Sequence, residues 1–175
     1  MSGILSLMLI VPLVAALICL FVNANQARWI ALGATLIDLA LGGVLWANFE
    51  IGGPQWQFVE YTPVFGRFAW ALGIDGFALL LILLSVFLMP ICIGASWEAI
   101  TTRVQEYMAA FLITEVLMIG TFAAQDIFLF YVFFEAGLIP MFLIIGILTA
   151  NEAKKASHSH VWTCAGKSYA IRSGM

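Results

Sequence analysis

The sequence predicts an all-α protein, a polytopic transmembrane helical bundle of about five transmembrane helices. The chain of 175 residues is 63% hydrophobic and only 10% charged, whereas a soluble domain carries about 25% charged residues. Its mean hydropathy is +1.06. Residues 1–147 form apolar runs long enough to cross a bilayer, which takes about 20 residues per helix, and residues 148–175 form a polar tail.

The first two spans are expected at residues 4–22 and 29–49, separated by a turn at 23–26. The first begins without Lys or Arg, unlike a secretory signal, and Pro12 predicts a mild kink. A signal peptide cleaved after Ala24 is the alternative. Trp29 and Trp46 lie near the ends of the second span, where interfacial aromatic residues are common.

Residues 51–75 form the one long polar connection. Partial alternation between Gln55 and Tyr61 predicts a short strand or hairpin on the membrane surface. Its aromatic residues are expected to anchor it among lipid headgroups rather than to bind a cofactor. The third span is expected at 76–96, broken by Pro90 and closed by Trp97.

Residues 107–147 form a continuous apolar tract that is too long for one crossing. Its polar interruption at 124–126 predicts a tight turn between a fourth span at 107–124 and a fifth at 126–147. The tail, 148–175, lacks hydrophobic periodicity and is expected to be disordered or loosely bound to the surface. The spacing of His158, His160 and Cys164 matches no zinc pattern well, so a solvated tail is the preferred interpretation.

The basic residues predict the orientation of the chain. With five spans, one side receives Arg28, Arg103 and the four basic residues of the tail, and the other receives Arg67. Cytoplasmic loops carry an excess of Lys and Arg, so the N-terminus is expected outside and the tail in the cytoplasm. No basic patch indicates a nucleic-acid partner. Three scattered cysteines argue against a disulfide framework, and Cys19 and Cys92 are expected to be small buried hydrophobes.

The fifth span carries a carboxylate, Glu135, in its interior. A charge at mid-helix costs about 2.5–3.5 kcal/mol, whereas each Leu, Ile, Phe or Val returns about 0.3–0.6 kcal/mol, so the segment still inserts. Tyr131 shares the helical face of Glu135 and is a candidate hydroxyl partner. Pro140 cannot donate to the carbonyl of Ala136, which loosens the helix beside the acid. Glu135 is therefore a candidate proton carrier, and a protonated Glu that only bonds a neighbouring helix is the alternative.

Two further acids are expected at the same depth. Glu115 lies ten residues before Gln125, and Glu135 lies ten residues after it, so both carboxylates sit about 15 Å from the turn, near the midplane. Asp38, ten residues from Arg28, reaches a similar depth. For Asp38, a helix-packing hydrogen bond beside small residues is an equal alternative to a role in a proton path. If two of these acids face each other, they resist joint ionisation, and no Lys or Arg lies at this depth to neutralise them.

Several motifs resemble those of a known family. They are LGIDG at 72–76, LMIG at 117–120 and, above all, DIFLFYVFFEAGLIPM at 126–141. These segments are similar to subunit M (chain 4) of bacterial NADH-quinone oxidoreductase, one of the antiporter-like proton-pumping subunits of respiratory complex I. The resemblance covers about residues 1–147.

The resemblance implies a role for the acids and a setting for the chain. In that family the fifth-helix glutamate, which Glu135 matches, belongs to the proton pathway and pairs with a lysine on a later, broken helix. Glu115 matches a fourth-helix position where many relatives carry an acid. Proton transfer there is driven by quinone reduction elsewhere in the complex. The resemblance implies a multi-pass protein of the bacterial inner membrane, with other membrane subunits as partners. No cofactor and no catalysis are expected from this chain alone, because NADH, FMN, iron–sulfur clusters and quinone are expected on other subunits.

Two departures from the family pattern are visible. Family members have many more helices, so the later helices and the partner lysine are missing here, and residues after 147 look foreign, as a frameshift or gene break would produce. Two alternatives stay open. One is a subunit of a multisubunit cation/proton antiporter or a membrane-bound hydrogenase, which shares this ancestry. The other is a non-catalytic truncated fragment in which the three acids only pack helices.

Overall fold

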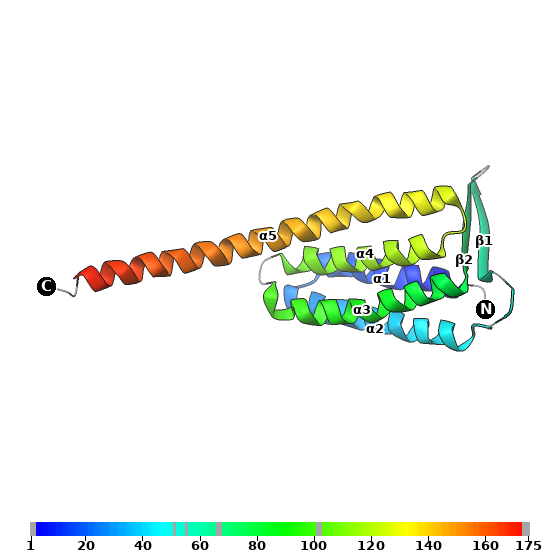
Figure 1. Cartoon of the computed structure of the whole chain (residues 1–175), viewed down its shortest axis with the longest axis horizontal. Coiled ribbons are helices and arrows are strands. Elements are labelled where there is room, and N and C mark those ends of the chain that lie inside the picture. The colour runs from blue at the N-terminus through cyan, green and yellow to red at the C-terminus, as the bar shows by residue number, and fades with distance from the viewer. Residues whose placement is uncertain (1–2, 51, 55, 66–67, 101–102, 173–175) are drawn as a thin grey trace.

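Five helices and one β-hairpin follow one another along the described part of the chain (Figure 1). A computed structural model describes residues 3–50, 52–54, 56–65, 68–100 and 103–172, without the side chains of 62–65, 68–69, 98–99 and 151–172. The elements are α1 (Ile4–Phe21), α2 (Ala24–Ala47), β1 (Gln57–Phe65), β2 (Phe68–Ile74), α3 (Gly76–Ala99), α4 (Val104–Ala123) and α5 (Ile127–Arg172). All five helices are long and apolar enough to cross a membrane. The predicted polytopic helical bundle is therefore confirmed.

Two predicted details of the early spans are wrong. The turn expected at 23–26 is shorter, because α2 already begins at Ala24. Close packing explains this, since Ala27 is fully buried and its carbonyl accepts from the thiol of Cys19 on α1. The expected break at Pro90 is absent, and α3 runs through it to Ala99. One missing helical hydrogen bond is tolerated where neighbouring helices support the segment.

The end of the chain also differs from expectation. Instead of becoming irregular after residue 147, α5 continues as a helix to Arg172 and extends past the bundle (Figure 1). Residues 150–172 contain five Ala and three Lys, which are good helix formers, so local propensity supports the helix where hydrophobic periodicity is lacking. The side chains of His158, His160 and Cys164 lie outside the described part.

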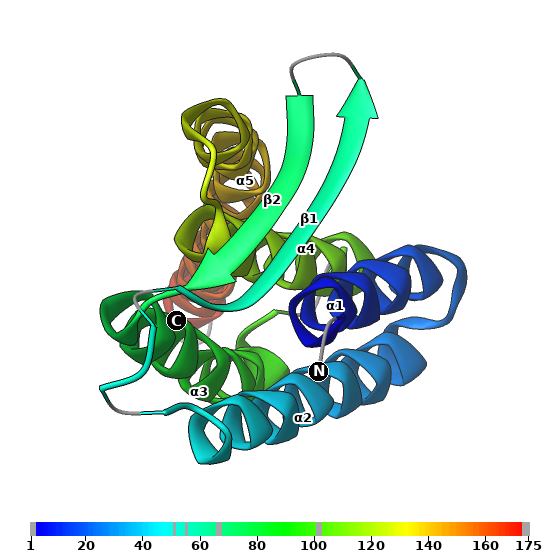
Figure 2. The same ribbon diagram turned by 90° about the vertical axis from the view of Figure 1, so that its right-hand side faces the viewer.

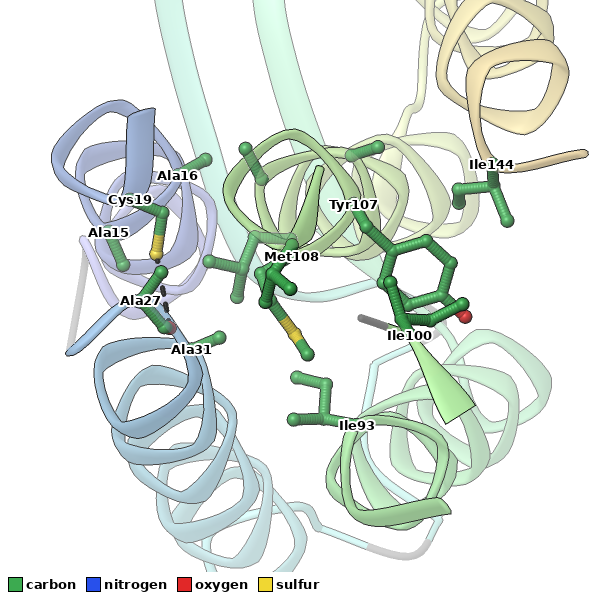
Figure 3. Close-up of a cluster of buried hydrophobic side chains, with 14 of the residues drawn as sticks. Ala15, Ala16, Cys19, Ala27, Ala31, Ile93, Ile100, Tyr107, Met108 and Ile144 are labelled. Carbon is green, nitrogen blue, oxygen red and sulfur yellow. Dashed lines mark hydrogen bonds between the residues drawn. The ribbon is translucent and has the colours of Figure 1, made fainter. Parts of the chain in front are cut away.

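Helix α4 lies at the centre of the bundle and packs against each of the other four helices. Small residues of α1 and α2, among them Ala16, Cys19 and Ala31, let these helices approach closely, and Met108 of α4 fills the space between them and Ile93 of α3 (Figure 3). Cys19 is buried as predicted, whereas Cys92 is only partly buried. A second apolar cluster continues the core toward the hairpin.

The α1–α2 turn and the α3–α4 connection meet at one end of the bundle. Arg28 donates to the carbonyl of Ile100 at 2.8 Å and lies 5.8 Å from the ring centre of Trp97. Trp29 packs edge-on against the same ring, with centres 5.2 Å apart. Gln105 donates to the carbonyl of Val22. Arg28 and the connection that carries Arg103 therefore lie at the same end of the bundle, while the cytoplasmic orientation of that end stays a prediction.

The hairpin predicted between the second and third spans is confirmed, and it covers the opposite end of the bundle (Figure 2). Strands β1 and β2 pair antiparallel, with a register shift between Gln57 and Glu60, where Phe58 takes a φ of 55°. Such bulges redirect side chains. Here Glu60 reaches the first turn of α1, where its carboxylate accepts from the backbone of Gly3, Leu5 and Ser6 and from the Ser6 hydroxyl.

The hairpin also fixes the turn between α4 and α5. Gln125 donates its backbone N–H to the carbonyl of Ala71 at 3.0 Å, and its side chain lies over Gly73, where a Cβ atom would clash with it. Asp75 then caps α3 by accepting from the N–H of Ala78 at 2.7 Å. The segment that contains the LGIDG motif therefore contacts the α4–α5 turn and fixes its position. The position of this turn determines the depth of Glu115 on α4 and Glu135 on α5.

Candidate functional site

The three predicted acids lie at a common depth. The tight turn predicted at 124–126 is confirmed, because α4 ends at Ala123 and α5 begins at Ile127. Glu115 and Glu135 are each eight residues from these helix ends, which places both about 12 Å from the turn. Asp38, on α2, interacts electrostatically with Glu115 and so belongs to the same layer.

Asp38 and Glu115 are both buried inside the bundle, close enough to interact electrostatically. Both residues are 0% exposed. None of their four carboxylate oxygens has a hydrogen-bond partner among the described residues. Asp38 therefore shows no partner, among the described residues, for the helix-packing hydrogen bond considered for it. One of the small residues near Asp38, Gly42, lets Val86 of α3 approach to within 3.0 Å of where a Cβ would lie.

Glu135 has a different environment. It lies on an exposed face of α5 with Tyr131, which is 58% exposed and hydrogen-bonds the glutamate through its side chain. Tyr131 is thus the partner that its spacing predicts. Phe133, two residues before Glu135, points to the other side of α5 and is buried against Gly120 of α4.

On α4 as well, the acid and the residues that contact the other helix lie on different faces. Ile113 and Leu117 line the grooves shared with α5, and each is two residues from Glu115, or about 200° around a helix. Glu115 therefore points away from α5, and Glu135 points away from α4. The two glutamates lie at the same depth, but their side chains point in opposite directions, away from the α4–α5 contact.

Pro140 lies in that contact. It is buried and, together with Ala136, lines a groove of about 420 Å³ between α4 and α5. Because proline has no N–H, the carbonyl of Ala136 lacks its usual helical donor. The groove is otherwise almost entirely apolar, with Glu106 as its charged member. Pro140 thus introduces a weak point in the helix one turn beyond Glu135.

The arrangement offers two acid sites on opposite sides of one helix pair. One is an exposed carboxylate with a phenol beside it, and the other is a closed pair of carboxylates. Counting residues from the turn gives the depth of these groups, but not the direction in which they face. The Asp38–Glu115 pairing has no signal in a single sequence. Within the described residues, no group of three or more His, Cys, Asp and Glu side chains could hold a metal ion.

Comparisons with known proteins agree on one family. A sequence profile described as NADH-ubiquinone oxidoreductase chain 4, amino terminus, matches residues 6–124, which include Asp38 and Glu115. NADH-quinone oxidoreductase subunit M of Rhodobacter capsulatus is 44% identical over 159 residues, covering 87% of this chain and 31% of the relative. NADH-ubiquinone oxidoreductase chain 4 of Mycosarcoma maydis is 39% identical, covering 95% of this chain and 36% of the relative. Chain 4 of Arabidopsis thaliana is 40% identical, covering 86% and 31%.

The chain spans about a third of the length of the curated relatives it matches. These names favour the complex I interpretation over the antiporter or hydrogenase alternative. The profile covers more than half of the chain. The chain therefore belongs to the NADH-ubiquinone oxidoreductase chain 4 family, of which it matches the amino-terminal part.

Proposed function

We propose that this chain provides the amino-terminal helices of an antiporter-like, proton-translocating subunit of NADH:quinone oxidoreductase. Family membership and five membrane-spanning helices support this proposal. Its setting is the bacterial inner membrane, and its partners are the other membrane subunits of that complex. NADH, FMN, iron–sulfur clusters and quinone belong to other subunits, so this chain moves protons and carries out no redox chemistry.

The observation that carries the proposal is the position of Glu135. Its carboxylate lies eight residues into the span at Ile127–Ala150, about 12 Å from the start of that span, on a face of α5 that no other described helix covers. An acid at this depth costs about 2.5–3.5 kcal/mol when it is ionised in lipid. Intramembrane acids therefore face protein or a water-filled cavity. This face of α5 accordingly packs against further protein in the assembled subunit.

In this position Glu135 binds and releases a proton as the charge beside it changes. A cation that approaches the carboxylate stabilises the ionised form and releases the proton, and its withdrawal favours re-protonation. Tyr131 positions the carboxylate through its hydroxyl. Pro140 allows α5 to flex below the site, because the carbonyl of Ala136 has no helical donor to break.

Glu115 and Asp38 are proposed as proton-pathway residues of a second site. They are buried between α2 and α4, on the far side of α4 from Glu135. A direct relay from Glu115 to Glu135 is therefore not part of the proposal. Each site exchanges protons on its own side of the α4–α5 pair.

The test is Glu135→Gln in the intact complex, reconstituted into vesicles. Glutamine keeps the shape of the side chain but cannot carry a proton, so the number of protons taken up per NADH oxidised should fall while NADH oxidation itself continues. Glu50→Gln, an exposed acid whose hydrogen bonds use its backbone, is the matched control. A proton-to-NADH ratio in Glu135→Gln that equals that of the control would contradict the proposal.

A further inference from the structure

The buried pair formed by Asp38 and Glu115 presents a problem of charge. As carboxylates, the two groups offer four acceptor oxygens and no donor, and all four are buried without a hydrogen-bond partner among the described residues. An unpartnered buried polar atom costs about 1–3 kcal/mol, and an isolated buried charge costs considerably more. Two such groups that also repel each other need a hydrogen-bond donor or a positive charge between them.

The hydroxyl groups of Thr35 and Ser85 do not supply a hydrogen-bond donor to the two carboxylates. Thr35, one turn from Asp38 and fully buried, donates to the carbonyl of Leu32 at 3.0 Å. Ser85 of α3 donates to the carbonyl of Leu81 at 2.9 Å. Both hydroxyls are therefore occupied by the backbone of their own helix.

The basic residues are also placed elsewhere. Before residue 150 the sequence holds three cations, Arg28, Arg67 and Arg103. Arg28 is ten residues from Asp38, or about 15 Å along the helix, and it donates to the carbonyl of Ile100. Arg103 pairs with Glu106 at 2.8 Å. Arg67 lies outside the described residues.

Among the described side chains, the other charged groups of the neighbouring helices lie away from the pair. The sequence of α1 contains no charged residue, and the acid of α3, Glu98, is near the end of its helix. Glu135 of α5 faces the opposite side of α4. The neighbours of Glu115 along its own helix, Leu112, Val116 and Ile119, are buried and apolar.

We propose that Asp38 and Glu115 form a proton-sharing carboxyl pair that holds at least one proton between them in the resting protein. A proton turns one acid into a donor, and its O–H can then bond the other acid across the α2–α4 contact. Protonation also removes the like-charge repulsion that two carboxylates would suffer there. A metal cation fits less well, because Ca²⁺ takes about six to eight oxygen ligands, and the buried neighbours of Glu115 on α4 are apolar.

This pair is independent of the exchange proposed for Glu135, and its test has a separate readout. Infrared difference spectra of the intact complex in lipid, in H₂O and in D₂O, detect the carbonyl stretch of a protonated carboxyl group. The variants Asp38→Asn, Glu115→Gln and the double variant are compared with the wild type. Glu106→Gln, an acid paired with Arg103 at the helix end, is the matched control.

A protonated-carboxyl band that moves in D₂O, and is lost or displaced in both single variants but unchanged in the control, is the expected result. The double variant should remove it completely. Three results would overturn the proposal. One is the absence of any such band, another is a band that responds to one variant alone, and the third is a carboxylate band that changes with added Na⁺ in place of the proton signal. The outcome for proton pumping in Glu135→Gln does not affect these measurements.

Discussion

Glu60 is expected to hold the first turn of α1 closed, and its removal should open that turn. Its carboxylate accepts from the backbone N–H of Gly3 at 2.8 Å, Leu5 at 3.0 Å and Ser6 at 3.2 Å, and from the Ser6 hydroxyl. The first four N–H groups of a helix have no partner within the helix. Gly3, which precedes α1, provides no side-chain cap. A residue of the hairpin therefore takes the place of the missing local cap.

The size of the effect follows from these contacts. Losing an N-cap costs about 0.5–2 kcal/mol, and hydrogen bonds to charged groups contribute about 1.5–3 kcal/mol each. Glu60 is partly exposed, so water competes and the values are not additive. We expect Glu60→Ala to cost about 2 kcal/mol, or about thirtyfold in the opening equilibrium of the first turn. Glu60→Gln keeps one carbonyl acceptor and should cost about 1 kcal/mol, about fivefold.

Amide hydrogen exchange of the membrane-embedded protein, followed at the peptide that contains Leu5 and Ser6, measures this opening. These two N–H groups owe their protection to Glu60, so their exchange should accelerate in the order wild type, Glu60→Gln, Glu60→Ala. Glu50→Gln, also exposed on the hairpin side of the bundle, should leave them unchanged. Equal exchange in Glu60→Ala and the wild type would refute the idea that the hairpin caps α1.

Two further predictions concern helix packing and capping. Gly120→Ala should destabilise the protein by about 1–3 kcal/mol, because its Cβ would lie 2.7 Å from a ring carbon of Phe133. Thermal unfolding in lipid nanodiscs measures this loss of stability. The control is Gly94→Ala, which should be tolerated because a Cβ there meets nothing within 4 Å. Asp75→Ala should cost about 0.5–2 kcal/mol by removing the cap of α3, whereas Asp75→Asn should restore most of it, since Asn is an equally good N-cap. Equal melting temperatures for the two glycine variants, or for the two Asp75 variants, would contradict these assignments.

Much of the fold could be predicted from the sequence because a membrane span is recognised from the composition of a single continuous segment. Twenty apolar residues predict a crossing wherever they occur, and the polar turn at 124–126 divides the long tract correctly. The errors arose where packing or local helix propensity decides where a helix begins or ends. The α1–α2 turn is short because Ala27 packs on Cys19, and residues 148–172 are helical without an amphipathic pattern.

The long-range joints could not be predicted. Glu60 and Ser6 are 54 residues apart, and nothing local marks Glu60 as a cap. The contact of Gly73 with Gln125 is similarly distant. A single sequence indicates that a glycine or an acid is present, but the partner becomes visible only when the chain is folded.

For the acids, the sequence gives the depth but not the facing direction, and the direction decides the chemistry. Ile113 and Leu117 of α4 and Phe133 of α5 lie between Glu115 and Glu135. These side chains are apolar, so they offer a proton no group to bond on a straight path, and an unpartnered charge there is costly. A proton that enters the Asp38–Glu115 pair must therefore arrive through the interior of the α1–α4 bundle, whereas the exchange proposed for Glu135 takes place on the opposite face of α5. It follows that Asp38→Asn should leave the response of proton pumping to Glu135→Gln intact. If the two substitutions instead affected pumping as a single unit, the α4–α5 contact would have to open during turnover.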